Sequence, residues 1–150
     1  MFFKRFIICF TLALLLPIFS SCTFSDPIID SLPRYTSKSF FTSGGFQDYT
    51  DYAKYTYDSI TVQDFEASEF FRTVTYADVE EILLYIDNFE EWVQITGGKL
   101  QANYDFDKSV VSKGDFFYIK TKDTYGKYDD YTVYYFDVDV LTLYYFHNNI

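Results

Sequence analysis

Cysteine is scarce in this sequence, and its placement limits how the chain is stabilised. The 150 residues include two cysteines, Cys9 and Cys22, both within the first 22 positions. The rest of the chain therefore cannot form an internal disulfide, even in an oxidising compartment that would permit one. Side-chain packing must stabilise the folded part instead.

Histidine is scarcer still, because His147 is the only one. A zinc site takes three or four ligands from histidine, cysteine and acidic residues, so a single imidazole argues against zinc. A Ser-His-Asp or Cys-His arrangement needs a nucleophile beside a positioned base, and the sequence has no Gly-x-Ser-x-Gly elbow. We interpret His147 as a strand-end residue and predict no catalytic residue, metal site or cofactor.

Long apolar runs are lacking except near the amino terminus. Phe6 to Phe19 is an apolar stretch of about 14 residues that follows Lys4 and Arg5 and precedes Ser20-Ser21. A bilayer-spanning helix needs about 20 residues, whereas a basic region, a short apolar core and small residues together are typical of a secretory signal. The pattern predicts a signal peptide over residues 1–21 that is removed from the mature protein.

The sequence Phe19-Ser20-Ser21-Cys22 resembles the lipobox of bacterial lipoproteins, Leu-(Ala/Ser)-(Gly/Ala/Ser)-Cys, with phenylalanine in place of the usual leucine. The resemblance implies that the Cys22 thiol is diacylated and becomes the amino terminus after cleavage. Two or more acyl chains anchor a protein stably. We therefore expect a lipid anchor at Cys22 on the extracytoplasmic face of the cell membrane; an ordinary cleaved signal and an uncleaved anchor are the alternatives.

The charge of the chain is strongly negative. The net charge is −10, and removal of residues 1–21, which carry two basic residues and no acid, makes it −12. Such a surface repels nucleic acid, so we predict no nucleic-acid partner. Residues 22–39 are rich in serine, threonine and proline and are predicted to be the lipidated cysteine and a flexible tether. Residues 40–150 suit a single domain.

Two segments are predicted to be helical. In residues 76–94 apolar side chains recur every three or four positions, and Thr75 with Asp78 forms a variant of the capping box. Gly97-Gly98 is expected to end this helix. In residues 46–57 tyrosines keep a near-helical spacing, and we favour a helix there. A strand is the alternative, because tyrosine and threonine favour sheets and the apolar residues also alternate.

Later segments have the composition of strands. Runs rich in tyrosine, phenylalanine, valine and threonine predict strands at 100–106, 115–122, 131–138 and 141–147, with a short strand near 70–72. The fold class predicted is α+β. It comprises an antiparallel sheet of about four strands, mainly in residues 100–147, with the helices 46–57 and 76–94 packed on one face.

Aromatic residues make up 23% of the chain, and two interpretations are open. A buried tyrosine ring keeps its hydroxyl hydrogen-bonded, so tyrosines can complete a thin core. Alternatively, rings that alternate outward along the strands form an exposed binding face. We favour the first interpretation.

Acidic pairs are frequent. Two carboxylates about 5–9 Å apart can hydrolyse glycosidic bonds, and calcium prefers oxygen ligands. Asp105-Phe106-Asp107 and Asp137-Val138-Asp139 are the clearest calcium candidates, but neither continues into an EF-hand loop. We interpret the acidic pairs as solvated faces.

The stretches GFQDYTDYAKY, YDFDKSVVSKGDFFYIK and YTVYYFDVDVLTLYYFHNN resemble small uncharacterised lipoproteins of low-GC, gut-dwelling Gram-positive bacteria. The resemblance implies membrane anchorage and assigns no activity. The leading hypothesis is a non-enzymatic binding or interaction module with a protein or glycan partner. The alternative is an inhibitor, immunity or accessory subunit for a basic protein, and a small carboxylate-based hydrolase is the third hypothesis.

Overall fold

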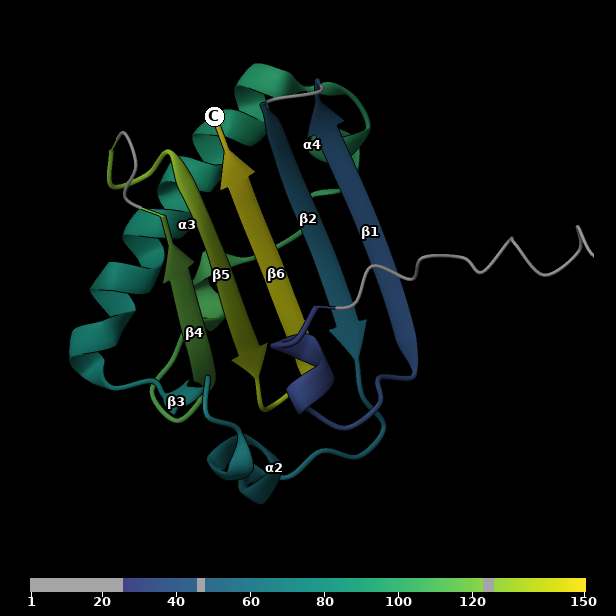
Figure 1. The fold of residues 1–150 in the computed structure, drawn as a ribbon, viewed down its shortest axis with the longest axis vertical. Coiled ribbons are helices and arrows are strands. Elements are labelled where there is room, and N and C mark those ends of the chain that lie inside the picture. The colour runs from purple at the N-terminus through teal and green to yellow at the C-terminus, as the bar shows by residue number, and fades with distance from the viewer. Residues whose placement is uncertain (1–25, 46–47, 123–125) are drawn as a thin grey trace, which may run out of the picture.

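The computed structural model describes residues 26–45, 48–122 and 126–150, and its central element is one six-stranded antiparallel sheet (Figure 1). The strand order is β1-β2-β6-β5-β4-β3. The strands are β1 (Ser37–Gly44), β2 (Tyr49–Thr56), β3 (Arg72–Thr73), β4 (Phe116–Thr121), β5 (Asp130–Asp137) and β6 (Thr142–Asn149).

Within the described residues, three helices and two single 3-10 turns accompany the sheet. They are η1 (Ile29–Ser31), α2 (Val62–Ala67), α3 (Tyr76–Thr96), α4 (Gly98–Asn103) and η2 (Lys108–Val110). The α+β class is confirmed, although the sheet has six strands rather than about four. In the part of the chain that the structure describes, no helix is both long and apolar enough to cross a bilayer.

The helix predicted at 76–94 is confirmed as α3. The Thr75 backbone N–H and hydroxyl both donate to the Asp78 carboxylate, at 2.8 and 2.6 Å, which completes the capping box. The helix ends at Gly97, whose φ of 62° is a conformation that glycine adopts without strain. The buried side of α3 packs on the sheet through Ile82, Tyr85, Ile86, Phe89 and Val93.

The helix predicted at 46–57 is wrong, because this segment contains strand β2. Tyr52 and Ala53 are both fully buried although they point to opposite faces of the sheet. A strand buried on both faces loses the apolar–polar alternation that would identify it. Without that alternation, the near-helical spacing of the tyrosines was the remaining periodic signal, and it led to the prediction of a helix.

The strand predicted at 100–106 is also wrong, because residues 98–103 form α4. Gly97 and Gly98 both have positive φ, so the chain changes direction there and starts a new helical turn. Leu100 is fully buried in the core under the sheet and fixes this short helix in place. The strands predicted at 115–122, 131–138 and 141–147 are confirmed as β4, β5 and β6, and the short strand predicted near 70–72 overlaps β3 at Arg72.

Helices lie on both faces of the sheet, which differs from the one-sided packing predicted. Tyr131, Val133 and Tyr135 of β5 point toward α3 and α4, while Tyr134 and Phe136 point toward η1 and α2 on the other face. Figure 1 shows α3 behind the sheet and η1 in front of it. The central strand β5 is buried on both faces as a result.

The residues predicted as a flexible tether, 22–39, are folded from Asp26 onward. Ile28 and Leu32, on either side of η1, are buried against the sheet, and Asp26 accepts a 2.8 Å hydrogen bond from the Tyr134 hydroxyl. Strand β1 begins at Ser37, before the predicted domain start at residue 40. The apolar residues in this segment are therefore core residues, and the domain begins earlier than predicted.

Candidate functional site

A polar row crosses the sheet on the face that carries η1. The strand register places Thr42 beside Asp51, Asp51 beside His147, His147 beside Thr132, and Thr132 beside Lys120. The row lies toward the end of the sheet away from η1 and α2 (Figure 1). An imidazole between a carboxylate and a hydroxyl is the residue set of nucleophilic catalysis, so its geometry must be considered.

The hydrogen bonds of His147 determine which nitrogen carries the proton. Its Nδ1 atom lies 3.0 Å from the Tyr131 carbonyl oxygen and 2.8 Å from the Thr132 hydroxyl. A carbonyl can only accept, so Nδ1 is protonated and donates to it. Burial lowers the pKa of His147 below 6.5, so the ring is neutral at pH 7. Because Nδ1 already holds a proton, it cannot take one from Thr132, and this pair is not a nucleophile with its base.

Asp51, beside His147 in the polar row, is nearly buried, with 9% of the residue exposed. Burial raises the pKa of this carboxyl, an effect that the hydrogen bond from Thr42 and the nearby His147 oppose. The recess beside His147 measures about 40 Å³ and is lined by residues of β4, β5 and β6. That volume suits about one water molecule and is too small for a substrate.

The acidic pairs considered for calcium have local structural roles. Asp105 accepts a 2.9 Å hydrogen bond from Tyr52 and forms a 2.5 Å ion pair with Lys54. Asp107 accepts from the Ser109 backbone N–H at 2.9 Å. Asp137 accepts from the backbone of the turn between β5 and β6. Within the described ranges, no group of three or more histidine, cysteine or acidic residues is placed to hold a metal ion.

The sequence alone did not identify the buried carboxylate of Asp115. Asp115, just before β4, is only 2% exposed. It accepts hydrogen bonds from the Ser112 N–H and hydroxyl, the Tyr135 hydroxyl and the Val138 N–H. Buried acids often mark active sites, but these donors satisfy both oxygens of Asp115 and tie three segments together. The signal in the sequence was the Ser-Lys-Gly-Asp turn at 112–115, where a serine and an aspartate bracket a glycine.

The outward side of α3 is strongly acidic. Arg72 lies 3.4 Å from Asp78 and 3.5 Å from Glu81, and Lys108 binds two further acids of the helix at 2.5 and 2.8 Å. The exposed Glu80 and Glu91 form no ion pair with any described residue. The helix has no basic residue, and its acids are Asp78, Glu80, Glu81, Asp87, Glu90 and Glu91.

Apolar side chains interrupt this acidic surface. Tyr76, Leu84 and Ile95 are 82%, 47% and 69% exposed, and with Glu80 and Glu91 they follow one another at helical spacing along one side of α3. A hollow of about 330 Å³ lies beside the first half of the helix. It is lined by Tyr76, Val79, Glu80, Leu83, Leu84 and Asp87, so an apolar floor has acids at its margin. We call this stripe and hollow the α3 face.

The aromatic residues do not form a contiguous exposed patch in the described chain. Phe40 on β1 and Tyr76 on α3 are the exposed aromatic side chains there, and they belong to different layers. Most tyrosines lie in the two cores. Several of their hydroxyls find partners inside the protein, as Tyr131 donates to the Tyr85 carbonyl at 3.1 Å, whereas the buried Tyr57 hydroxyl has no hydrogen-bond partner among the described residues. The interpretation of tyrosines as core residues is confirmed by their burial.

Cys22, the predicted lipidation site, lies outside the described residues. A scan against protein-family models gives no match to the chain. Searches of curated proteins and of solved structures give no match either. The function is therefore argued from the geometry alone.

Proposed function

We propose that this protein is a non-enzymatic binding module whose α3 face binds a basic, amphipathic segment of a partner protein. We further propose that a lipid on Cys22 holds it at the extracytoplasmic face of the cell membrane. The observation that carries the binding role is the α3 face itself, where unpaired acids alternate with exposed apolar side chains. An inhibitor, immunity or accessory subunit for a basic protein is the class that fits it.

The charge of the α3 face selects the partner. Arg72 and Lys108 pair with four of the six carboxylates of the helix. Lys113 and Lys127 lie over the Tyr76 and Tyr85 rings, so the acids of the helix still outnumber the cations beside it. Such a concentration of one sign attracts a cationic partner from a distance and repels anionic ones. Glu80 and Glu91 form no ion pair with a described residue, so they are the acids best placed to meet incoming lysine or arginine side chains.

The apolar part of the α3 face selects the shape of the segment that binds. An amphipathic helix inserts apolar residues spaced three or four apart into a groove on its target. The hollow near Leu84 and Val79 offers about 330 Å³ for such a side chain. Acidic margins around an apolar floor therefore favour a segment with apolar residues on one side and basic residues beside them.

The neutral imidazole of His147 supports a binding role over a catalytic one. Its Nδ1 atom donates to a carbonyl, so it cannot activate the neighbouring Thr132 as a general base requires. Asp115 is only 2% exposed and accepts hydrogen bonds from Ser112, Tyr135 and Val138. His147 and Asp115 therefore stabilise the sheet, and we assign binding to surface residues.

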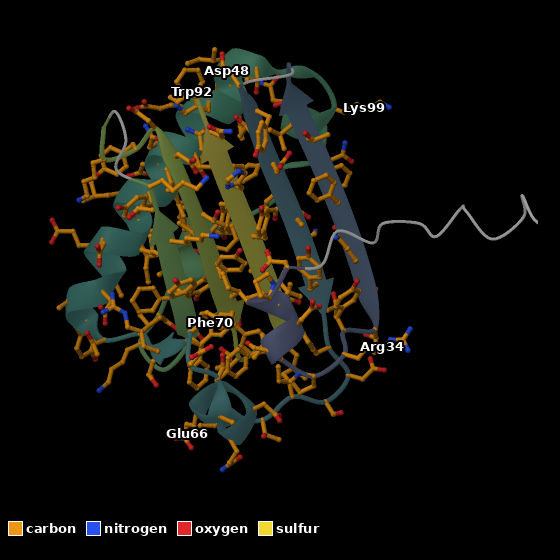
Figure 2. All side chains as sticks on the ribbon, in the orientation of Figure 1. Arg34, Asp48, Glu66, Phe70, Trp92 and Lys99 are labelled. Carbon is orange, nitrogen blue, oxygen red and sulfur yellow. The ribbon has the colours of Figure 1, made fainter. Side chains whose placement is uncertain are left out.

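Charge reversal on α3 tests the proposed binding. The probe is a synthetic amphipathic helix of leucine and lysine, with a leucine–glutamate peptide of the same pattern as its counterpart. We expect the double variant Glu80→Lys/Glu91→Lys to bind the lysine peptide at least about tenfold more weakly than the unmodified chain, as measured by fluorescence anisotropy. The matched control is Glu66→Lys, an exposed acid on α2 at the far end of the molecule from Trp92 of α3 (Figure 2).

Three outcomes would contradict the proposal. The first is equal binding of the lysine and glutamate peptides. The second is an equal loss of affinity in the Glu66→Lys control, which would show attraction to net charge rather than to the α3 face. The third is a Leu84→Ser variant that binds as tightly as the original, because it would remove the role assigned to the apolar floor.

A further inference from the structure

Strand β1 forms one edge of the sheet, and its backbone can accept another strand. The Gly45 N–H donates to the Asp48 carbonyl at 2.8 Å, which identifies the hydrogen-bonded pairs between β1 and β2. In an antiparallel pair these alternate, so odd-numbered β1 residues point their backbone groups toward β2. The N–H and C=O groups of Lys38, Phe40 and Thr42 therefore point outward from the edge.

This edge lacks the features that usually prevent strand pairing. Protected edges are short, carry proline or several charges, or contain a bulge. Strand β1 pairs with β2 without interruption over eight residues, and its only charged residue is Lys38. Phe40, near the middle of β1, is 48% exposed. The opposite edge differs, because β3 covers part of β4 and Arg72 lies over the Phe117 ring at 4.3 Å.

The two ends of the edge carry opposite charges. Arg34 precedes β1, and Asp48 follows the tip of the hairpin at the other end (Figure 2). Both side chains are exposed, and neither forms an ion pair with a described residue. An antiparallel neighbour with the same sequence places its own Asp48 near Arg34 and its own Arg34 near Asp48. The edge is therefore complementary to itself.

We propose that two copies of this chain pair antiparallel through β1, Arg34 and Asp48 to form one continuous sheet of twelve strands. The two-fold axis passes beside Phe40. In this register Phe40 forms a hydrogen-bonded pair with Phe40 of the second copy, and Lys38 pairs with Thr42 of the second copy. The register that joins Phe40 to itself uses the outward backbone groups identified above and separates the two lysines.

Charge and orientation both allow this dimer. In Figure 1 the acidic helix α3 begins beside β3 and β4, at the edge of the sheet opposite β1, and only its last turn reaches β1, where the Ser43 hydroxyl donates to Thr96 at 3.0 Å. Pairing through β1 therefore keeps the first halves of the two acidic helices apart. A two-fold axis perpendicular to the sheet also leaves η1 of both copies on the same face. Asp26 of both copies, where the described fold begins, then lies on this face, which fits the proposed anchorage of both copies in a single membrane.

A charge swap tests the dimer in the full chain, purified in detergent with a large excess of micelles over protein. We expect a concentration-dependent dimer by analytical ultracentrifugation. Arg34→Glu or Asp48→Arg places like charges together at both ends of the interface, so each should raise the dimer dissociation constant about tenfold. The combined variant Arg34→Glu/Asp48→Arg restores opposite charges and should return the constant close to its original value.

Two further variants keep the test independent of folding. Lys38→Pro removes an outward N–H on an edge strand, where proline is tolerated, and the exposed lysine forms no ion pair with a described residue, so it should weaken the dimer while the melting temperature of the monomer changes little. A photo-crosslinking residue in place of Phe40 should give a crosslinked dimer in membranes. A chain that stays monomeric at every concentration up to its solubility limit overturns the proposal. A dimer that is insensitive to the single swaps, or that the double swap does not restore, places the interface elsewhere and also overturns it.

Discussion

The hydrogen bonds of Asp115 allow one stability prediction to be worked out in detail. The perturbation is Asp115→Ala. It removes a buried acceptor that four donors share: the Ser112 N–H at 3.2 Å, the Ser112 hydroxyl at 2.9 Å, the Tyr135 hydroxyl at 2.5 Å and the Val138 N–H at 3.2 Å. The effect on the free energy of unfolding depends on which of these donors finds another partner.

Two of the four donors keep a partner. The Tyr135 hydroxyl also lies 2.9 Å from the Val110 carbonyl and can turn to it, and the exposed Ser112 side chain can bond to water. The Ser112 and Val138 N–H groups, whose hydrogen bonds to Asp115 are partly buried, lose their acceptor. A buried donor left unpaired costs about 1–3 kcal/mol, so we expect Asp115→Ala to destabilise the protein by about 3 kcal/mol. Asp115→Asn keeps one acceptor oxygen and should cost about half as much.

Urea unfolding measures this loss, with the single Trp92 on α3 as the fluorescent probe. A loss of about 3 kcal/mol leaves most domains of this size folded, so the variant should still give a complete unfolding transition. Asp139→Ala is the matched control, because Asp139 is an exposed acid in the nearby turn, and it should change stability by less than about 0.5 kcal/mol. A loss below about 1 kcal/mol for Asp115→Ala would refute the assignment of Asp115 as a structural centre.

Two other predictions concern pH and lipidation. The pKa of His147 is below 6.5 in the folded chain and about 6.5 when unfolded, so the unfolded chain binds more protons below pH 6.5. His147 therefore contributes stability above pH 6.5 that is lost as the pH falls. The variant His147→Asn keeps an N–H near the position of Nδ1, and we expect its melting temperature to fall less between pH 7.5 and 5.5 than that of the unmodified chain. An equal fall in melting temperature for the two proteins would contradict this. In cells fed a clickable fatty acid, we expect labelling of the protein and none of Cys22→Ala, and equal labelling would exclude Cys22 as the acylated residue.

Helix α3 buries one side and was predicted from its period, whereas strand β2 is covered on both sides and was predicted as a helix. Strand β5 is also covered on both sides, and its composition rather than a period identified it. Helix α3 shows a clear stripe because its outer side is polar and its inner side is apolar. Strand β2 shows no such contrast because Tyr52 and Ala53 are buried on opposite faces. Periodicity reports a difference between faces, so a strand that is covered on both sides carries no periodic signal to read.

Segments whose structure depends on distant contacts were also missed. Residues 26–32 resemble a tether locally, and only the contact of Ile28 and Leu32 with the far strands makes them part of the core. Asp115 is similar, since its donors include Tyr135 and Val138, 20 or more residues away. The sequence predicted part of the α3 face, because it showed the helix and its acids. The exposure of Tyr76 and Leu84 could be seen only in the structure.

The start of the described fold at Asp26, the α3 face and the β1 edge lie on different parts of the molecule. Only Thr23 to Ser25 separate Cys22 from Asp26, where the described fold begins, and four residues span at most about 15 Å. In the anchorage that we propose, the face with η1 therefore lies near the membrane, and α3, on the opposite face, points away from it. Pairing through β1 would present two α3 faces outward together. A partner with two basic segments would then gain affinity from the second contact without any new interaction.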